Sequence, residues 1–309
     1  MDILNSVFGS SIIVGGIFPM IFFGLMDFLF RYFSIKIPFQ NVFLFTSFGG
    51  MIAMGILSYF LFGINSGNYI EIFTKNNYDT IFIGGILGVI WTLAIFSMGF
   101  AYEKLNANGS QIIPIASASG LLTSVLSIVI LGETGNLYYL FLSAFIIFAG
   151  VLFLQKAEII NVSEKVSKNN ISNFLPIFVG GIIPLISFGV LNTMFKAYYE
   201  LNSGALGIIM GATGIILSLI VQIVRNQKLR FEPKFLLTGI VWAIAVASLG
   251  YGFYPLMGKA SILLPIAGAS PLISVLLVAI FLDEKVNWNY IVIGSILIFS
   301  GVISLHIFL

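Results

Sequence analysis

Two pairs of polar side chains interrupt long apolar stretches and could hold a charge or move a proton. Asp27 and Arg31 lie four residues apart, on one face of a helix, where they can pair. Asn192 and Lys196 repeat that spacing in a second apolar stretch. A charge inside hydrocarbon costs roughly 2.5–3.5 kcal/mol on insertion scales, so each needs a reason to be there. We predict coupling or gating for Asp27, Arg31 and Asn192; the alternative is a structural ion pair with Arg31 reaching the membrane edge.

A second set of side chains could contact an uncharged polar solute. Trp91 and Trp242 fall in the middle of apolar stretches, where an indole needs a partner for its N–H and can stack on a ligand. Gln111, Ser119 and Ser270 add an amide and two hydroxyls. We predict solute binding by these five residues. The alternatives are core packing for the indoles, and bonding of the hydroxyls to their own helix backbone.

Three prolines lie inside two of the apolar stretches: Pro114, Pro265 and Pro271. Proline removes a backbone hydrogen bond and bends a helix. The freed carbonyls must find partners or line a cavity. We therefore expect these prolines to bend their helices and to supply movement.

Several kinds of chemistry are excluded by residues that are rare or missing. The chain has no Cys and a single His, His306, so a zinc site or a Ser-His-Asp triad would have to use that residue. We predict no metal site, no cofactor and no enzymatic activity. The net charge of +2 is too small to indicate nucleic-acid binding.

The elements that position these residues are membrane helices. Of the 309 residues 59% are hydrophobic and only 8% are charged, whereas soluble domains carry about 25% charged residues. A stretch of about 20 apolar residues spans a bilayer. The fold class predicted is an all-α polytopic membrane protein with ten transmembrane helices, in the plasma membrane. The ten stretches are 12–33, 39–62, 80–102, 108–131, 137–155, 175–199, 203–224, 235–255, 259–282 and 288–308.

An internal repeat organises these ten stretches. Nine of the seventeen positions from 14 to 30 are identical to those 165 residues later, and a second series, which includes Trp91 and Trp242, runs at an offset of 151. We predict a five-helix repeat over 1–156, a polar linker over 157–174 and a second repeat over 175–309. Because five is odd, the two repeats must be inverted, an arrangement typical of secondary transporters.

The ends of the repeats resemble a known superfamily. Leu131-Gly-Glu133 with Phe148-Ala-Gly-Val151, and Leu282-Asp-Glu284 with Phe299-Ser-Gly-Val302, are similar to the repeat endings of the drug/metabolite transporter superfamily in its EamA-type form. Asp283 departs from the usual glycine. Residues 88–94 and 112–117 also resemble the glucose/ribose porter branch. The resemblance implies the ten-helix fold and transport, without a substrate.

The resulting hypothesis is a secondary transporter that moves a small neutral or zwitterionic solute by alternating access, because little charge lies inside the apolar stretches. A sugar-specific uptake porter and an ion-independent facilitator remain alternatives, as do a membrane enzyme and a channel-like or structural protein. The expected partners are the solute, the lipid bilayer and a coupling ion such as H⁺ or none. The sequence leaves a monomer and a homodimer both open.

Basic residues predict an orientation. Eleven of the fourteen Lys and Arg residues fall at the odd-to-even connections between stretches, and three at the other face. The positive-inside rule places the basic face in the cytoplasm and both termini outside. Members of the resembled superfamily usually have both termini inside, so the two arguments conflict, and we follow the charges.

Overall fold

A computed structural model gives the fold of the chain over most of its length. It describes residues 10–34, 37–61, 78–105, 112, 115–133, 136–157, 170–198, 203–226, 228–230, 232–253, 256–281 and 286–308. Within these ranges the secondary structure is helical, apart from turns and the isolated bridge residue Val286. The prediction of an all-α protein is confirmed.

The described residues form a series of helices. In chain order they are α2 (Ser10–Ile12), η1 (Ile13–Ile17), α3 (Phe18–Ser34), α4 (Phe39–Leu61), α6 (Tyr78–Lys104), α8 (Ser119–Leu131), α9 (Leu137–Ala157), α10 (Asn170–Ile177), η2 (Phe178–Ile182), α11 (Ile183–Ala197), α12 (Ser203–Val224), α13 (Phe235–Phe253), α14 (Ala260–Ala267), α15 (Pro271–Phe281) and α16 (Trp288–Phe308). The last five residues of the predicted linker, 170–174, are therefore helical.

The described residues contain eight helices that are long and apolar enough to cross a membrane, and two shorter apolar helices, Ile115–Leu131 and Trp288–Ser304. Large apolar side chains cover their outer surfaces, with Phe60, Phe82 and Phe145 each more than 60% exposed. So much exposed apolar surface is expected where a protein faces lipid. The chain is an integral multi-pass membrane protein.

In the part of the chain that the structure describes, several of the spans are built from more than one helix. The π-helix η1 separates α2 from α3, and η2 separates α10 from α11. The span at 260–281 breaks at Gly268–Ser270, between α14 and α15. Such interruptions are uncommon in membrane helices, and π-helical turns are frequent at functional sites.

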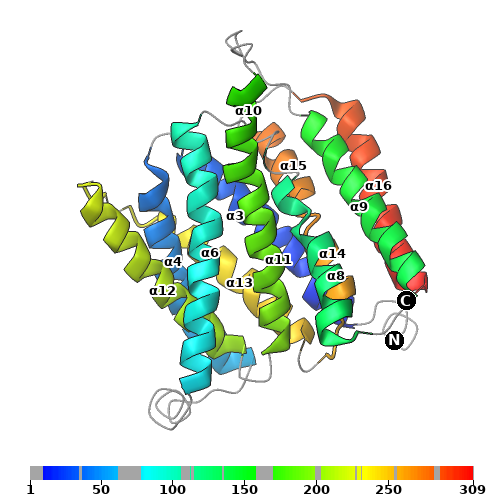
Figure 1. Ribbon diagram of the computed structural model, residues 1–309, viewed down its shortest axis with the longest axis horizontal. Helices are drawn as coiled ribbons and strands as arrows, with labels where there is room; N and C mark the ends of the chain where they lie inside the picture. Colours follow the sequence, from blue (N-terminus) through cyan, green and yellow to red (C-terminus); the bar gives the residue numbers. More distant parts are fainter. Residues whose placement is uncertain are drawn as a thin grey trace.

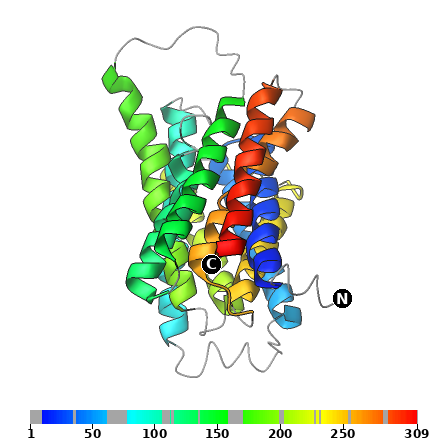
Figure 2. The same cartoon turned by 90° about the vertical axis from the view of Figure 1, so that its right-hand side faces the viewer.

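The helices pack side by side in the bundle that Figures 1 and 2 show from two directions. α4 packs against α12 and α13, α6 against α12 and α11, and α3 against α13 and α15. α9 and α16 pack mainly on each other, at one side of the bundle (Figure 1). Helices from the two ends of the sequence thus interleave throughout the structure.

The first and sixth predicted spans run in opposite directions. Gly15, at the start of the first, lies against Gly252 at the end of α13. Lys196, at the end of the sixth, donates to the carbonyl of Gly258 a few residues later. The start of one span and the end of the other therefore lie at the same end of the bundle, which we call the α14 end; the opposite, where α3 and α6 end, is the basic end.

Candidate functional site

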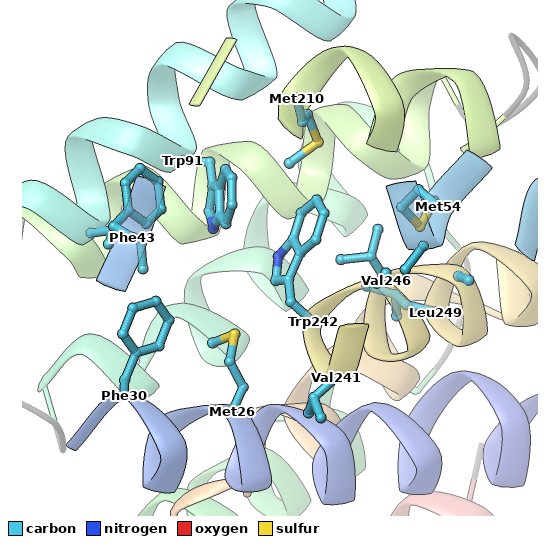
Figure 3. Close-up of a cluster of buried hydrophobic side chains, with 14 of the residues drawn as sticks. Met26, Phe30, Phe43, Met54, Trp91, Met210, Val241, Trp242, Val246 and Leu249 are labelled. Carbon is cyan, nitrogen blue, oxygen red and sulfur yellow. The ribbon is translucent and has the colours of Figure 1, made fainter. Parts of the chain in front are cut away.

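The two tryptophans predicted to bind solute lie face to face in the core. The ring centroids of Trp91 in α6 and Trp242 in α13 are 4.5 Å apart, and the ring planes are inclined by 21°. Phe43 of α4 packs on Trp91, with centroids 4.9 Å apart, and Met26 of α3 lies beside the indoles (Figure 3). Both indoles are at most 3% exposed. In this conformation one face of each indole is occupied by the other ring, which leaves no room for a solute between them.

Each indole also packs directly on a helix backbone. A Cβ at Gly50 of α4 would lie 2.6 Å from Cε3 of Trp242, and one at Gly214 of α12 would lie 3.1 Å from Cζ3 of Trp91. Any larger side chain at Gly50 would force the ring to move. The four helices α4, α6, α12 and α13 thus meet around the tryptophan pair.

The two π-helices occupy equivalent places in the sequence repeat. η1 covers Ile13–Ile17 and η2 covers Phe178–Ile182, 165 residues later. Each contains two adjacent buried glycines, Gly15-Gly16 and Gly180-Gly181. The repeated sequence thus carries a repeated irregularity of the backbone.

These glycines are in tight contact with other helices. A Cβ at Gly15 would lie 2.8 Å from the Cα of Gly252 and 2.6 Å from Cδ1 of Leu263. A Cβ at Gly180 would lie 2.7 Å from the Cβ of Ala101 and 2.8 Å from Cδ1 of Ile112. Gly252 and Leu263 stand 151 residues after Ala101 and Ile112, the offset of the second repeat series.

Glu133 joins the end of α8 to the start of α14. Gly132 ends α8 in a left-handed conformation with φ of 66°, a common helix ending. The next residue, Glu133, accepts hydrogen bonds from the backbone N–H of Ala260 at 2.8 Å and of Ser261 at 2.9 Å. Its carboxylate satisfies amides that a helix N-terminus leaves unpaired. The sequence Leu131-Gly132-Glu133 therefore has a structural explanation.

Lys196 contacts the connection that leads into the same helix start. Its Nζ donates to the carbonyl of Gly258 at 2.9 Å and lies 5.0 Å from the centre of the Phe253 ring. Glu200, four residues later and so a possible partner on the same helix face, lies outside the described residues. At the α14 end, the turn before α14 is held by a lysine and by Glu133 from two different spans.

Pro265 lies inside α14, as predicted, and its effect is compensated by another helix. Proline has no N–H, so the carbonyl of Ser261, four residues earlier, loses its helical partner. The hydroxyl of Ser124 in α8 lies 3.1 Å from that carbonyl and 3.0 Å from the carbonyl of Gly120, and shares its one hydrogen between them. A side chain thus replaces the bond that the proline removes.

Asp27 and Asn192 occupy equivalent positions on α3 and α11. Each is half-buried and lies one turn beyond a glycine, Gly24 and Gly189, that is in tight contact with a neighbouring helix. A Cβ at Gly24 would lie 2.6 Å from the Cβ of Ile273 in α15, and one at Gly189 would lie 2.6 Å from Cδ2 of Leu122 in α8. Residues three apart share a helix face, so Asp27 lies on the α15 side of α3.

The remaining predicted residues are spread over the bundle. Ser119 is the first residue of α8, and Ser270 closes the break before α15; both are buried. Pro271 is the first residue of α15, where its missing N–H costs nothing, whereas the sequence predicted a bend within one helix. Arg31 lies in α3, with its side chain outside the description. Gln111 and Pro114 lie outside the described residues.

Comparison with known proteins gives a relative without an assigned role. The chain is 32% identical over 131 residues to an uncharacterized protein of Methanocaldococcus jannaschii, a match that covers 41% of this chain and 93% of the relative. The chain belongs to the family of this archaeal protein. No family model matches it. The archaeal relative is less than half as long as this chain, so the shared family includes a protein close in size to one predicted repeat.

The fold is also similar to that of a solved protein. A crystal structure with 17% sequence identity superposes with a TM-score of 0.72, over 96% of this chain and 95% of the other. At this identity the similarity shows the fold alone.

Three features of this protein were not predicted from the sequence: the stacking of the tryptophans on each other, the two π-helices, and the capping role of Glu133. Signals existed for two of them. The double glycines at 15–16 and 180–181 were repeated at the same offset, and Glu133 belonged to a repeated motif.

Proposed function

We propose that the protein is a secondary transporter of a small neutral or zwitterionic organic solute, built from two inverted five-helix repeats. We further propose that it is an EamA-type member of the drug/metabolite transporter superfamily and works by alternating access. In this mechanism the two repeats rock about a site between them, which faces each side of the membrane in turn.

The observation that carries this proposal is the equivalence of contacts between the repeats. η1 of the first repeat packs on Gly252 and Leu263 of the second, and η2 of the second packs on Ala101 and Ile112 of the first. Trp91 and Trp242 are a third equivalent pair and meet each other. Such reciprocal contacts are expected when two copies of one unit are related by a two-fold axis.

The opposite directions of the first and sixth spans support the inverted arrangement. In inverted repeats the axis lies in the membrane plane, and the solute site is found near that plane, where the repeats meet. The contact between Trp91 and Trp242 supports a meeting of the repeats at this pair. Interrupted helices line such sites in many transporters, and the spans through η1, η2 and the α14–α15 break are the interrupted ones here.

The nature of the solute follows from the side chains near this centre. The buried cluster around Trp91 and Trp242 is made of aromatic, aliphatic and methionine side chains, among them Phe43 and Met26 (Figure 3). The hydroxyls of Ser119, at the start of α8, and of Ser270, in the break before α15, are buried elsewhere in the bundle. These groups suit a solute with an apolar or ring-shaped part and hydrogen-bonding groups, and carry no charge to balance a dianion.

The test combines binding with exchange. Purified protein is screened by thermal shift against sugars and amino acids, since a ligand that binds the folded state raises the melting temperature. A solute that raises the melting temperature is then loaded into proteoliposomes, and the uptake of its labelled form is measured. We expect uptake to be accelerated by unlabelled solute inside, because a carrier returns faster when loaded.

The matched variants are Trp91→Phe and Trp288→Phe. Trp288 is 56% exposed at the start of α16, so its replacement should leave the solute-induced shift unchanged, whereas Trp91→Phe should reduce it. If internal solute does not accelerate the flux, the protein is a channel and not a carrier. An absence of any stabilising solute together with an absence of flux would overturn the transport proposal.

A further inference from the structure

Two buried amide oxygens without a hydrogen-bond donor mark the junction of α4, α6 and α12 near the basic end of the bundle. Within the part of the chain that the structure describes, Oε1 of Gln40 and Oε1 of Gln222 are inaccessible and accept no hydrogen bond. The two residues are only 4% and 3% exposed. Burying an acceptor without a donor is unfavourable, so two of them at one level call for a ligand or an explanation.

The two glutamines are tied to the same short segment of α4. Nε2 of Gln40 donates to Oε2 of Glu103 in α6 at 3.3 Å, and Nε2 of Gln222 in α12 donates to Oδ1 of Asn41 at 3.1 Å. Gln40 and Asn41 are successive residues in the first turn of α4. Both pairs therefore lie at the same depth in the bundle, Gln40 on the side of α4 that contacts α6 and Asn41 on the side that contacts α12.

The orientation of the Gln40 amide is fixed by its partner. An ionised carboxylate only accepts hydrogen bonds, so the amide nitrogen must face Glu103 and the oxygen must be the free atom. The other carboxylate oxygen of Glu103 accepts the backbone N–H of Phe39 at 2.8 Å. Gln40 cannot satisfy its oxygen by turning over without losing its bond to Glu103.

The chemistry of this cluster favours a hard cation. Carboxylate and amide oxygens are the ligands that such cations prefer. α6 ends at Lys104 and α12 at Val224, so two helix C-termini, which are partially negative, converge here against the single N-terminus of α4. Lys104 and Arg225, the basic residues at these two helix ends, are exposed.

We propose that Gln40, Asn41, Glu103 and Gln222 form a binding site for a monovalent alkali cation, Na⁺ or K⁺. One carboxylate balances one positive charge, and the two amide oxygens provide ligands that no group among the described residues uses. This proposal is independent of the proposed transport, because binding can be measured without a solute or a gradient.

The experiment measures the melting temperature of the purified full-length protein in detergent as NaCl or KCl replaces choline chloride at constant ionic strength. We expect one of the two alkali cations to raise the melting temperature in a saturable way. Glu103→Gln and Gln222→Leu should each increase the half-saturating concentration at least about tenfold, the scale of one lost ligand interaction. Ser143→Ala is the control, since Ser143 bonds only Ser304, between α9 and α16.

Two results would overturn the site: equal melting in sodium, potassium and choline salts, or an unchanged response in both variants. The first would mean that water satisfies the amide oxygens. If the variants do not fold, direct binding of ²²Na⁺ to the wild-type protein, in competition with K⁺ and choline, decides the question. Saturable binding that choline leaves intact supports the site, and no saturable binding of either cation removes it.

Discussion

Two carboxylates in this chain have different surroundings and therefore different expected roles. Glu133 lies at a helix end and is satisfied by two backbone amides of α14. Asp27 lies within a membrane-spanning helix and is half-buried. Intramembrane carboxylates are rare and often take part in proton or ion pathways. The first residue is thus expected to contribute to stability and the second to transport.

Replacement of Glu133 by alanine should destabilise the protein without changing its solute specificity. Two charge-assisted bonds to the start of α14 are lost, and helix N-caps are worth about 0.5–2 kcal/mol. Thermal unfolding in detergent checks this, with Lys228→Ala as the control, because Lys228 is exposed in the connection after α12. A melting temperature equal to that of the wild type would show that the cap contributes nothing.

The variant Asp27→Asn separates coupling from structure. If Asp27 couples transport, the variant should lose gradient-driven accumulation in proteoliposomes and keep counterflow exchange. If it only neutralises Arg31, the variant should instead melt at lower temperature, because a buried cation is left unpaired, and Arg31→Gln should restore stability. Normal gradient-driven uptake by the Asp27→Asn variant would show that Asp27 does not couple transport. The protein would then be interpreted as a facilitator.

At the scale of helices, a proline and a serine on different spans form one unit. Pro265 frees the carbonyl of Ser261, and Ser124 donates to it. Ser124→Ala should destabilise the protein by about 0.6–2 kcal/mol, the range for such bonds in membranes and in cores. In a Pro265→Ala background the alanine N–H can serve the carbonyl, so the effect of Ser124→Ala should largely vanish. A double-mutant cycle of melting temperatures measures this, and additive losses would contradict it.

Much of the helical structure could be predicted from the sequence. The limits of α12 coincide with the predicted stretch 203–224, and those of α13 differ by two residues, because uninterrupted apolar runs end at charged or turn residues. The sequence could not place the break at Gly268–Ser270 or the two π-helices, because these depend on contacts with distant helices.

The candidate site shows the same division. Trp91 and Trp242 were found by their matching places in the repeat, yet their contact with each other needed the packing of four helices. The hydrogen bond from Gln222 to Asn41 joins residues 181 positions apart, so it cannot be predicted from a local sequence pattern. Residue types indicate what chemistry is available, and tertiary packing decides which groups meet.

For the whole molecule, the distribution of basic residues predicts how it sits in the membrane. Lys104, Arg225, Arg230 and Lys234 lie near the basic end, where Glu232 accepts from Arg230 at 3.1 Å and from Lys234. The hydrogen bond from Lys234 lowers the pKa of Glu232. An acidic partner such as Glu232 does not change the predicted orientation, because the positive-inside rule counts Lys and Arg residues rather than net charge.

We therefore predict that the basic end faces the cytoplasm and that both chain ends face outward. A C-terminal fusion to a reporter that is active only outside the cytoplasm should give a strong signal, and a reporter active only inside should give none. Adding lysines to the connection between α8 and α9 should weaken this preference. A strong cytoplasmic signal from the wild-type fusion would reverse the orientation.

The stacked indoles also give the protein an intrinsic optical probe. Two chromophores with centroids 4.5 Å apart interact when they absorb light, so the pair should produce a paired positive and negative band in circular dichroism, to which the remote Trp288 adds nothing comparable. Because each ring belongs to a different repeat, any rocking of the repeats changes the distance or tilt between the rings. The amplitude of that band would then follow the conformational cycle in unlabelled protein, and either Trp91→Phe or Trp242→Phe should abolish it.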